Sequence, residues 1–236
     1  MVVTGTRASH AVALAACLAM VGGAHAQDQK GGDIYPRRAQ LPQYLARSEA
    51  EEVALARSAA PDSVSGLAEV QVLTAHGYRT AASGRNGFVC MVWRSWSDDF
   101  GDGQFWNPKV RAPICLNPIA AKTVLPAYLR RTDWALAGLS RAQMAARFRS
   151  AVDRNEVAAP GAGAMSYMMS RRGYLADGVG AAAPHIMFFV PRDARQQWGA
   201  NLPGSPIWSG QDALDPVALF FVSVPKWSDG TPATGH

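Results

Sequence analysis

The chain has 236 residues, of which 48% are hydrophobic and 17% are charged, and its formal net charge is +5 at pH 7. This length and apolar content suit one folded domain with a substantial core. The positive charges are spread along the chain rather than gathered into a basic stripe, which argues against a nucleic-acid-binding protein.

The first 26 residues have the pattern of a secretory signal peptide. Arg7 is the one charged residue among them, an apolar run follows over 11–23, and Ala24-His25-Ala26 forms a small-x-small cleavage site. The run is shorter than the roughly 20 apolar residues that a membrane helix needs. We therefore predict a periplasmic or secreted protein that is cleaved after Ala26 and keeps no integral membrane segment.

A lipoprotein signal is the alternative for this leader, because Leu14-Ala15-Ala16-Cys17 has the form of a lipobox. The apolar residues before the box are few, and the apolar run continues past the cysteine, whereas the apolar region of a lipoprotein signal should end there. We therefore favour cleavage after Ala26 over lipidation at Cys17.

Cys90 and Cys115 are the cysteines that remain after the leader is removed. Two cysteines in an exported chain most simply pair, and closing this loop should stabilise the fold by about 3 kcal/mol. A reactive thiol and a metal site are the alternatives, and the sequence places no base beside either cysteine. We predict a Cys90–Cys115 disulfide.

The first half of the chain is expected to form a helix followed by strands. Residues 27–46 are polar and rich in turn formers, which predicts a flexible lead-in to a single domain over 47–227. A helix should begin at Ser48, which precedes acidic residues, and end before Pro61. Strand patterns follow at 68–74, 78–82 and 88–94. Because Asn86-Gly87 is a strong hairpin turn, we expect an antiparallel meander.

The second half alternates helix and strand signals. A helix is expected over 117–131 with a break at Pro126, and another begins at the Ser140 capping box. Strand patterns follow at 164–170, 184–190 and 217–224, and residues 228–236 should be a disordered tail. The order of these elements predicts an α+β fold. We expect a mostly antiparallel sheet of five or six strands, with helices packed on one face and one disulfide.

Three pieces of the sequence resemble the landmarks of a family of exported bacterial proteins. They are the strand Asn86-Gly87-Phe88-Val89-Cys90, the second cysteine in Pro113-Ile114-Cys115, and the strand Pro184-His185-Ile186-Met187. The resemblance covers most of residues 48–200. It implies export, paired cysteines and a common fold, but no activity. The segment 96–109 is longer than the family pattern, so its aromatic residues are expected to be particular to this branch.

His185 is the first candidate for a catalytic residue, because a histidine at the mouth of a strand can act as a base. Ser166 and Ser170 are the candidate nucleophiles, although neither lies in a Gly-x-Ser-x-Gly turn or a Ser-x-x-Lys motif. The alternative is a partly buried histidine that bonds to the backbone. These residues make a serine-type hydrolase one alternative function.

Asp98, Asp99 and Asp102 lie in a glycine-containing loop that could hold a hard cation such as calcium. An EF-hand register fails, because Phe100 and Lys109 occupy positions that need oxygen ligands. An ordinary Asp/Gly turn is the other interpretation.

The long connection after the third strand pattern carries several aromatic residues beside these carboxylates. Exposed aromatic residues are typical of clefts that bind ligands, although they could instead cap one end of the core. We predict a binding protein without a cofactor, whose partner is an unknown small molecule, glycan or protein. A structural protein of the envelope is a further alternative. The predicted contact residues are Trp93, Arg94, Trp96 and Trp106.

Overall fold

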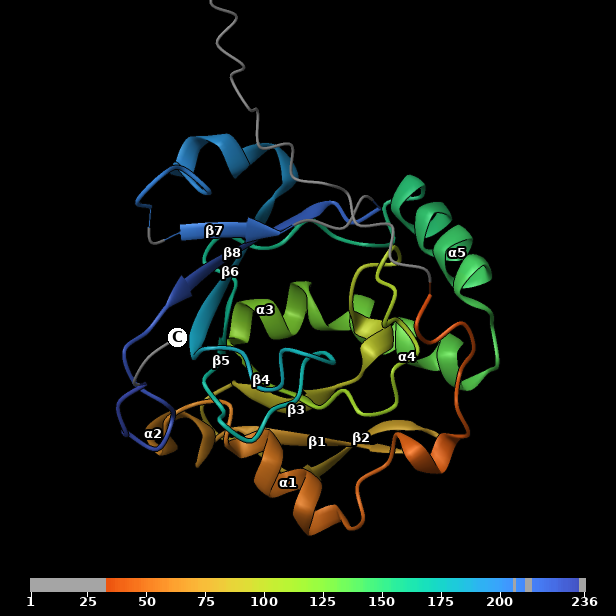
Figure 1. Ribbon diagram of the computed structural model, residues 1–236, viewed down its shortest axis with the longest axis horizontal. Helices are drawn as coiled ribbons and strands as arrows, with labels where there is room; N and C mark the ends of the chain where they lie inside the picture. The colour runs from red at the N-terminus through yellow and green to blue at the C-terminus, as the bar shows by residue number, and fades with distance from the viewer. Residues whose placement is uncertain (1–32, 206, 211–213, 234–236) are drawn as a thin grey trace, which may run out of the picture. The chain divides into compact units, whose positions relative to one another are not determined.

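The computed structural model describes residues 33–205, 207–210 and 214–233, so the predicted leader lies outside the described residues. Within them, one eight-stranded sheet has the strand order β2-β1-β3-β4-β5-β6-β8-β7 (Figure 1). Its strands are β1 (Glu69–Thr74), β2 (Gly77–Ala82), β3 (Val89–Trp93), β4 (Ala112–Leu116), β5 (Met165–Met168), β6 (His185–Pro191), β7 (Ile207–Gly210) and β8 (Val217–Ser223). The fold is α+β, as predicted, but the expected five or six strands are too few.

Five α-helices and three short 3-10 helices accompany this sheet in the described part of the chain. They are α1 (Glu49–Arg57), α2 (Asp62–Ser65), α3 (Pro118–Thr123), α4 (Leu125–Leu136), α5 (Arg141–Asp153), η1 (Leu41–Gln43), η2 (Ser95–Ser97) and η3 (Arg192–Trp198). Ser48 caps α1 and Ser140 opens α5 with a capping box, as their sequence patterns predict. The predicted break near Pro126 falls at Val124, between α3 and α4.

The meander predicted for the first three strands is wrong. β1 and β2 form an antiparallel hairpin, but β3 lies on the other side of β1 and runs parallel to it, with Val70 opposite Cys90. The Asn86-Gly87 turn therefore ends a crossover instead of a hairpin. Gly87 is needed there because its φ is +76°, a backbone conformation that side chains disfavour.

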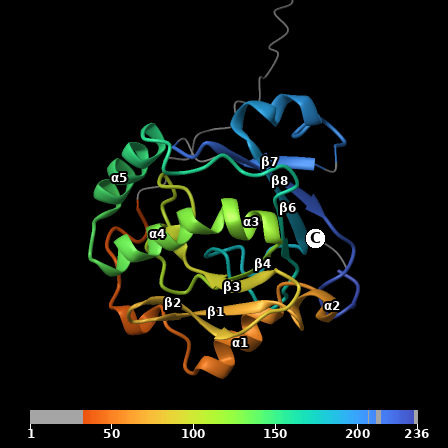
Figure 2. The ribbon, with the colours of Figure 1, turned by 180° about the vertical axis from the view of Figure 1, so that it is seen from behind.

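Helices cover both faces of the sheet, which corrects the expectation of one helical face. Side chains alternate between the two faces of a strand. Along β3, successive side chains therefore pack into two different cores, one on each face of the sheet. Cys90 and Val92 belong to the core on the α1 side, whereas Met91 and Trp93 belong to the core beside α3 and α4. Figures 1 and 2 show α1 and the pair α3 and α4 on opposite sides of β1, β3 and β4.

The sheet bends around α3 and α4. One continuous core joins inner side chains of β3 and β4 to those of β6 and β8, with Tyr128 of α4 among them. The bend falls at β5, which pairs with β4 at only two positions before it pairs with β6. Consequently the last strands form a second wall that faces the first one across the helices (Figure 1).

The predicted disulfide joins the two central strands. Cys90 and Cys115 lie directly opposite each other in the β3–β4 register, with their Cα atoms 4.0 Å apart. Both are fully buried under α1. The bond therefore closes the loop that carries the aromatic connection.

The predicted flexible lead-in and the predicted disordered tail both make contacts with the domain where the structure describes them. Tyr44 of the lead-in is fully buried, and its hydroxyl donates to the carbonyl of Trp106 at 2.8 Å. In the tail, the Ser228 amide donates to the carbonyl of Met169 at 2.9 Å. The folded unit therefore extends beyond 47–227 on both sides.

Among the described residues, no helix combines the length and the apolar character that crossing a bilayer requires.

Candidate functional site

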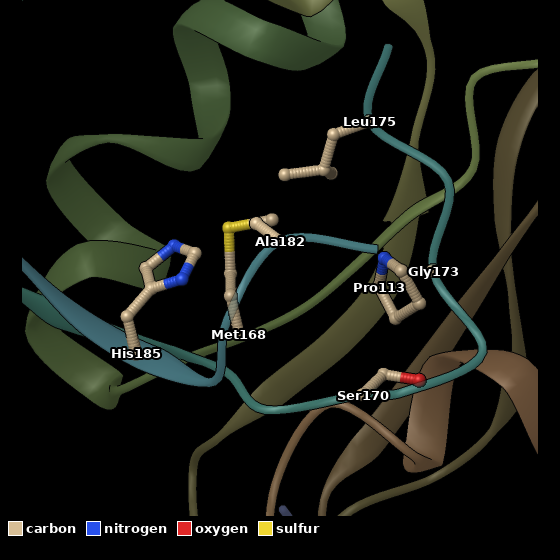
Figure 3. A pocket seen from close by; sticks show the side chains of 7 residues that line it. All are labelled: Pro113, Met168, Ser170, Gly173, Leu175, Ala182 and His185. Atoms are coloured by element: carbon tan, nitrogen blue, oxygen red, sulfur yellow. The ribbon is translucent and has the colours of Figure 1, made fainter. Parts of the chain in front are cut away.

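A cavity of about 170 Å³ lies at one end of the inner face of the bent sheet. Its walls come from the end of β3, the start of β4, helix α4, and the strands β6, β7 and β8. A small apolar pocket joins it beside His185, Met168 and Ala182 (Figure 3). The bend of the sheet brings these strand ends together. The order of the elements along the chain therefore does not predict the cavity.

Two stacked aromatic pairs form much of the cavity wall. Trp93 stacks on Tyr128 of α4 with their ring centroids 4.0 Å apart. From the other wall, Trp208 of β7 stacks on its cross-strand partner Phe221 at 3.9 Å and an interplanar angle of 9°. Trp208 is 45% exposed, so it forms the rim of the cavity. Flat aromatic walls of this kind suit a ring or an onium group.

His185 is the buried ionisable group at the base of the second wall. It begins β6 on the inner face, opposite Met168, and its ring lies 5.6 Å from that of Phe221. Its Nδ1 lies 2.8 Å from the carbonyl of Ala183 and donates to it, which leaves Nε2 as the nitrogen with a free lone pair. Burial lowers the pKa of His185, so the imidazole is neutral at pH 7.

Two polar atoms in the residues that line the cavity have no hydrogen-bond partner among the described residues. They are the indole Nε1 of Trp93 and the hydroxyl of Ser95. Buried polar groups are nearly always satisfied by the protein or by ordered water. Their presence in this wall marks the cavity as a place where a polar group can be accommodated.

Arg94 also lines the cavity, but its charge is compensated. Its Nη2 donates to both carboxylate oxygens of Glu52 at 2.8 Å, and its Nε donates to the carbonyl of Tyr44 at 2.7 Å. Both members of the ion pair are at least 98% buried. Arg94 therefore connects the wall to α1 and contributes no net charge to the site.

A groove of about 260 Å³ continues from the cavity along α4. It is lined by the ionisable residues Asp98, Asp99, Asp215 and Arg131. The cavity and the groove share the lining residues Ser97, Asp98, Tyr128, Leu219 and Phe221. Asp98 is open to solvent in this groove, yet the protein packed around its carboxylate raises its pKa through desolvation.

The predicted aromatic contact surface is divided by the structure. Trp93 and Arg94 line the cavity, whereas Trp96 and Trp106 are buried in a separate core with Phe100. The Trp96 indole donates to the Thr132 hydroxyl at 3.0 Å, which fixes it inside. The prediction that Trp96 and Trp106 form an exposed contact surface is therefore wrong, because the long connection folds inward.

His185 forms no catalytic pair with either candidate serine. The Ser170 hydroxyl lies 2.7 Å from that of Ser58, and Figure 3 shows it pointing away from His185, with Met168 and Ala182 between them. The Ser166 hydroxyl is buried without a hydrogen-bond partner among the described residues. Among the described residues, neither Ser166 nor Ser170 is therefore placed as a nucleophile beside His185.

The three aspartates of the connection hold its turns. Asp98 accepts from the Asp99 amide, Asp99 from the Gly101 amide, and Asp102 from the Gln104 amide. No group of three or more potential metal ligands occurs in the part of the chain that the structure describes. These amide contacts are those expected of an ordinary Asp/Gly turn.

Sequence reasoning missed Tyr128, Trp208 and Phe221. Tyr128 and Phe221 lie in correctly predicted elements, where their apolar character indicated core positions. Trp208 lies in β7, which has only four residues and gives too short a pattern to identify a strand. The apolar run over 217–223 indicated a strand, but not what the face that carries Phe221 encloses.

Comparisons with protein-family models, with curated proteins and with solved structures find no match to this chain. The resemblance to a family of exported bacterial proteins therefore stays a prediction.

Proposed function

We propose that this protein is an exported binding protein that holds a small molecule in the cavity between α4 and the bent sheet. The observation that carries the proposal is the cavity of about 170 Å³ with a stacked aromatic pair on each wall. An apolar cavity of about 150 Å³ is large enough to hold benzene. The part of the ligand that enters should therefore have the size of a single ring.

The polar groups around the cavity favour binding over chemistry. His185 offers a neutral Nε2 as an acceptor, but no serine among the described residues lies within hydrogen-bond reach of it. A few polar groups in an apolar pocket commonly orient a ligand. The buried Cys90–Cys115 bond is compatible with the oxidising compartment that the leader predicts.

Blocking the cavity tests this proposal. Ala182 lines it from a loop, so Ala182→Phe should fill the space without disturbing a strand. Ala181→Phe is the matched control, because Ala181 is next to Ala182 on the same loop and is not a lining residue. Binding of phenol, cyclohexanol and benzylamine would be measured by saturation-transfer NMR, with thermal unfolding as the check on folding.

At least one of these probes should bind to the wild type and to Ala181→Phe, and Ala182→Phe should lose the signal while it keeps its unfolding temperature. Equal binding to Ala182→Phe would place the probe elsewhere and overturn the proposal. Absence of binding by all three probes would also overturn it, and would favour a structural role in the envelope.

A further inference from the structure

We propose that the ligand of this cavity carries an uncharged carbonyl oxygen, which accepts hydrogen bonds from the Trp93 indole and the Ser95 hydroxyl. The inference rests on the proposed function and adds the chemical class of the ligand. The observation behind it is that two buried donors line the same cavity and find no acceptor among the described residues.

Both donors are buried together with the residues that carry them. Trp93 is 8% exposed and Ser95 is 3% exposed. An indole N–H can only donate a hydrogen bond, and a hydroxyl can turn its hydrogen toward whichever acceptor is present. A buried donor without an acceptor carries the cost of its lost hydration. A ligand that brings an acceptor into the cavity would remove this cost.

The backbone places the two donors on the same side of the chain. Trp93 ends β3 and Ser95 begins η2, and Arg94 between them is extended, with φ −111° and ψ 167°. Residues on either side of an extended residue face the same way and lie about 7 Å apart. The Arg94 side chain runs instead to Glu52 on α1. One ligand can therefore contact both Trp93 and Ser95.

A single oxygen can satisfy both groups. Two hydrogen bonds of about 2.9 Å to one acceptor join donors that are up to about 6 Å apart, which suits side chains that start about 7 Å apart along the chain. A carbonyl oxygen has two lone pairs and carries no hydrogen of its own, so it accepts twice without needing a further acceptor.

The charges around the cavity favour a neutral carbonyl over a carboxylate. Arg94 is the guanidinium in the described lining of the cavity, and Glu52 already neutralises it. Burial lowers the pKa of His185, so this residue supplies no positive charge at pH 7. A carboxylate would enter the cavity without a counter-charge, which is far more costly than the entry of a hydrogen-bonded neutral group.

The aromatic walls hold the donor and receive the rest of the ligand. Stacking on Tyr128, with ring centroids 4.0 Å apart, fixes the Trp93 indole before a ligand arrives, and such preorganisation favours binding. The second wall offers the flat stack of Trp208 on Phe221 to the apolar part of the ligand. A mostly apolar pocket with a few placed polar groups is the usual composition of a small-molecule site.

Two compounds of the same shape test the carbonyl directly. Cyclohexanone and methylenecyclohexane differ in the replacement of the carbonyl oxygen by a CH₂ group, and their affinities would be measured by NMR titration of the ¹⁵N-labelled full chain. Ser95→Ala and Trp93→Phe each remove one donor. Each should lower the ratio of the cyclohexanone affinity to the methylenecyclohexane affinity by about fivefold. Comparing this ratio between variants cancels the different hydration of the two compounds and any change in cavity shape.

Trp198→Phe is the matched control, since it makes the same substitution at a residue outside the lining. Trp198 packs on Phe220, with their ring centroids 4.8 Å apart. Phe220 precedes Phe221 on β8 and therefore faces away from the cavity. The affinity ratio should be the same in Trp198→Phe as in the wild type.

The outcomes distinguish this inference from the function on which it rests. An unchanged ratio in Ser95→Ala or in Trp93→Phe would overturn the assignment of a carbonyl to both donors, while a binding cavity remained. An equal fall in Trp198→Phe would also overturn it, because the effect would then not depend on groups that line the cavity. Absence of binding by both compounds would contradict the binding cavity itself.

Discussion

Removal of the Glu52 carboxylate should destabilise the protein strongly, because it would leave a guanidinium unpaired inside the core. Glu52 lies on α1 and receives two hydrogen bonds from Nη2 of Arg94, and a longer one of 3.4 Å from the Leu73 amide. The side chains of Arg94 and Glu52 are 0% and 2% exposed. Neither can turn toward water without opening the contact between α1 and the sheet.

The expected cost follows from this burial. Breaking a buried ion pair by removing one partner costs about 3–5 kcal/mol, whereas an exposed pair contributes about 0–1 kcal/mol. Glu49 provides the matched control, since it lies on the same helix and pairs with Arg79 at the surface, where both side chains are about half exposed. We expect Glu52→Ala to cost at least about 3 kcal/mol, and Glu49→Ala less than about 1 kcal/mol.

Urea unfolding followed by tryptophan fluorescence would measure both variants. The double variant Glu52→Leu with Arg94→Met should be more stable than Glu52→Ala alone, because it buries no unpaired charge. A loss for Glu52→Ala as small as that for Glu49→Ala, at an unchanged denaturant slope, would refute the account of the α1–sheet contact.

Three further predictions concern the disulfide, the aromatic core and the buried histidine. Replacing Cys90 and Cys115 together by Ala should cost about 3 kcal/mol in urea unfolding; no loss would mean that the bond does not constrain the unfolded chain. Trp96→Ala should lower the free energy of unfolding by about 3–5 kcal/mol in the same assay, since it empties a core position. An unchanged free energy of unfolding would contradict the burial of Trp96. Burial lowers the folded-state pKa of His185, so the unfolded chain binds its proton more readily and stability should fall as the pH drops below about 6.5. His185→Gln should flatten that decline between pH 7.5 and 5, and an unchanged pH profile would contradict it.

The elements that the sequence predicts best are those with local signals. The Ser48 and Ser140 caps lie within one turn of the backbone amides they bond, so their sequence patterns are sufficient to locate α1 and α5. The position of β3 depends instead on its pairing with β1, which the hairpin signal of Asn86-Gly87 did not predict. Strand order and the two helical faces follow from such long-range contacts.

The site was predicted in part for the same reason. His185 was singled out from its position at the mouth of a strand and Trp93 as an aromatic residue of the long connection, and both line the cavity. Trp93, Trp96 and Trp106 are the same residue type in the same aromatic connection. The sequence alone therefore could not tell which of them is buried in the core and which lines the cavity. Trp208 reaches the site through its pairing with β8, which no local pattern encodes.

The most direct test of the binding cavity is an indole-resolved NMR titration. The protein would be labelled with ¹⁵N-tryptophan and titrated with benzylamine, with each signal assigned by a Trp→Phe variant. Binding in the cavity predicts shifts for the indole signals of Trp93 and Trp208 and constant positions for those of Trp96 and Trp106. Shifts confined to Trp96 and Trp106, or the absence of any shift, would contradict it.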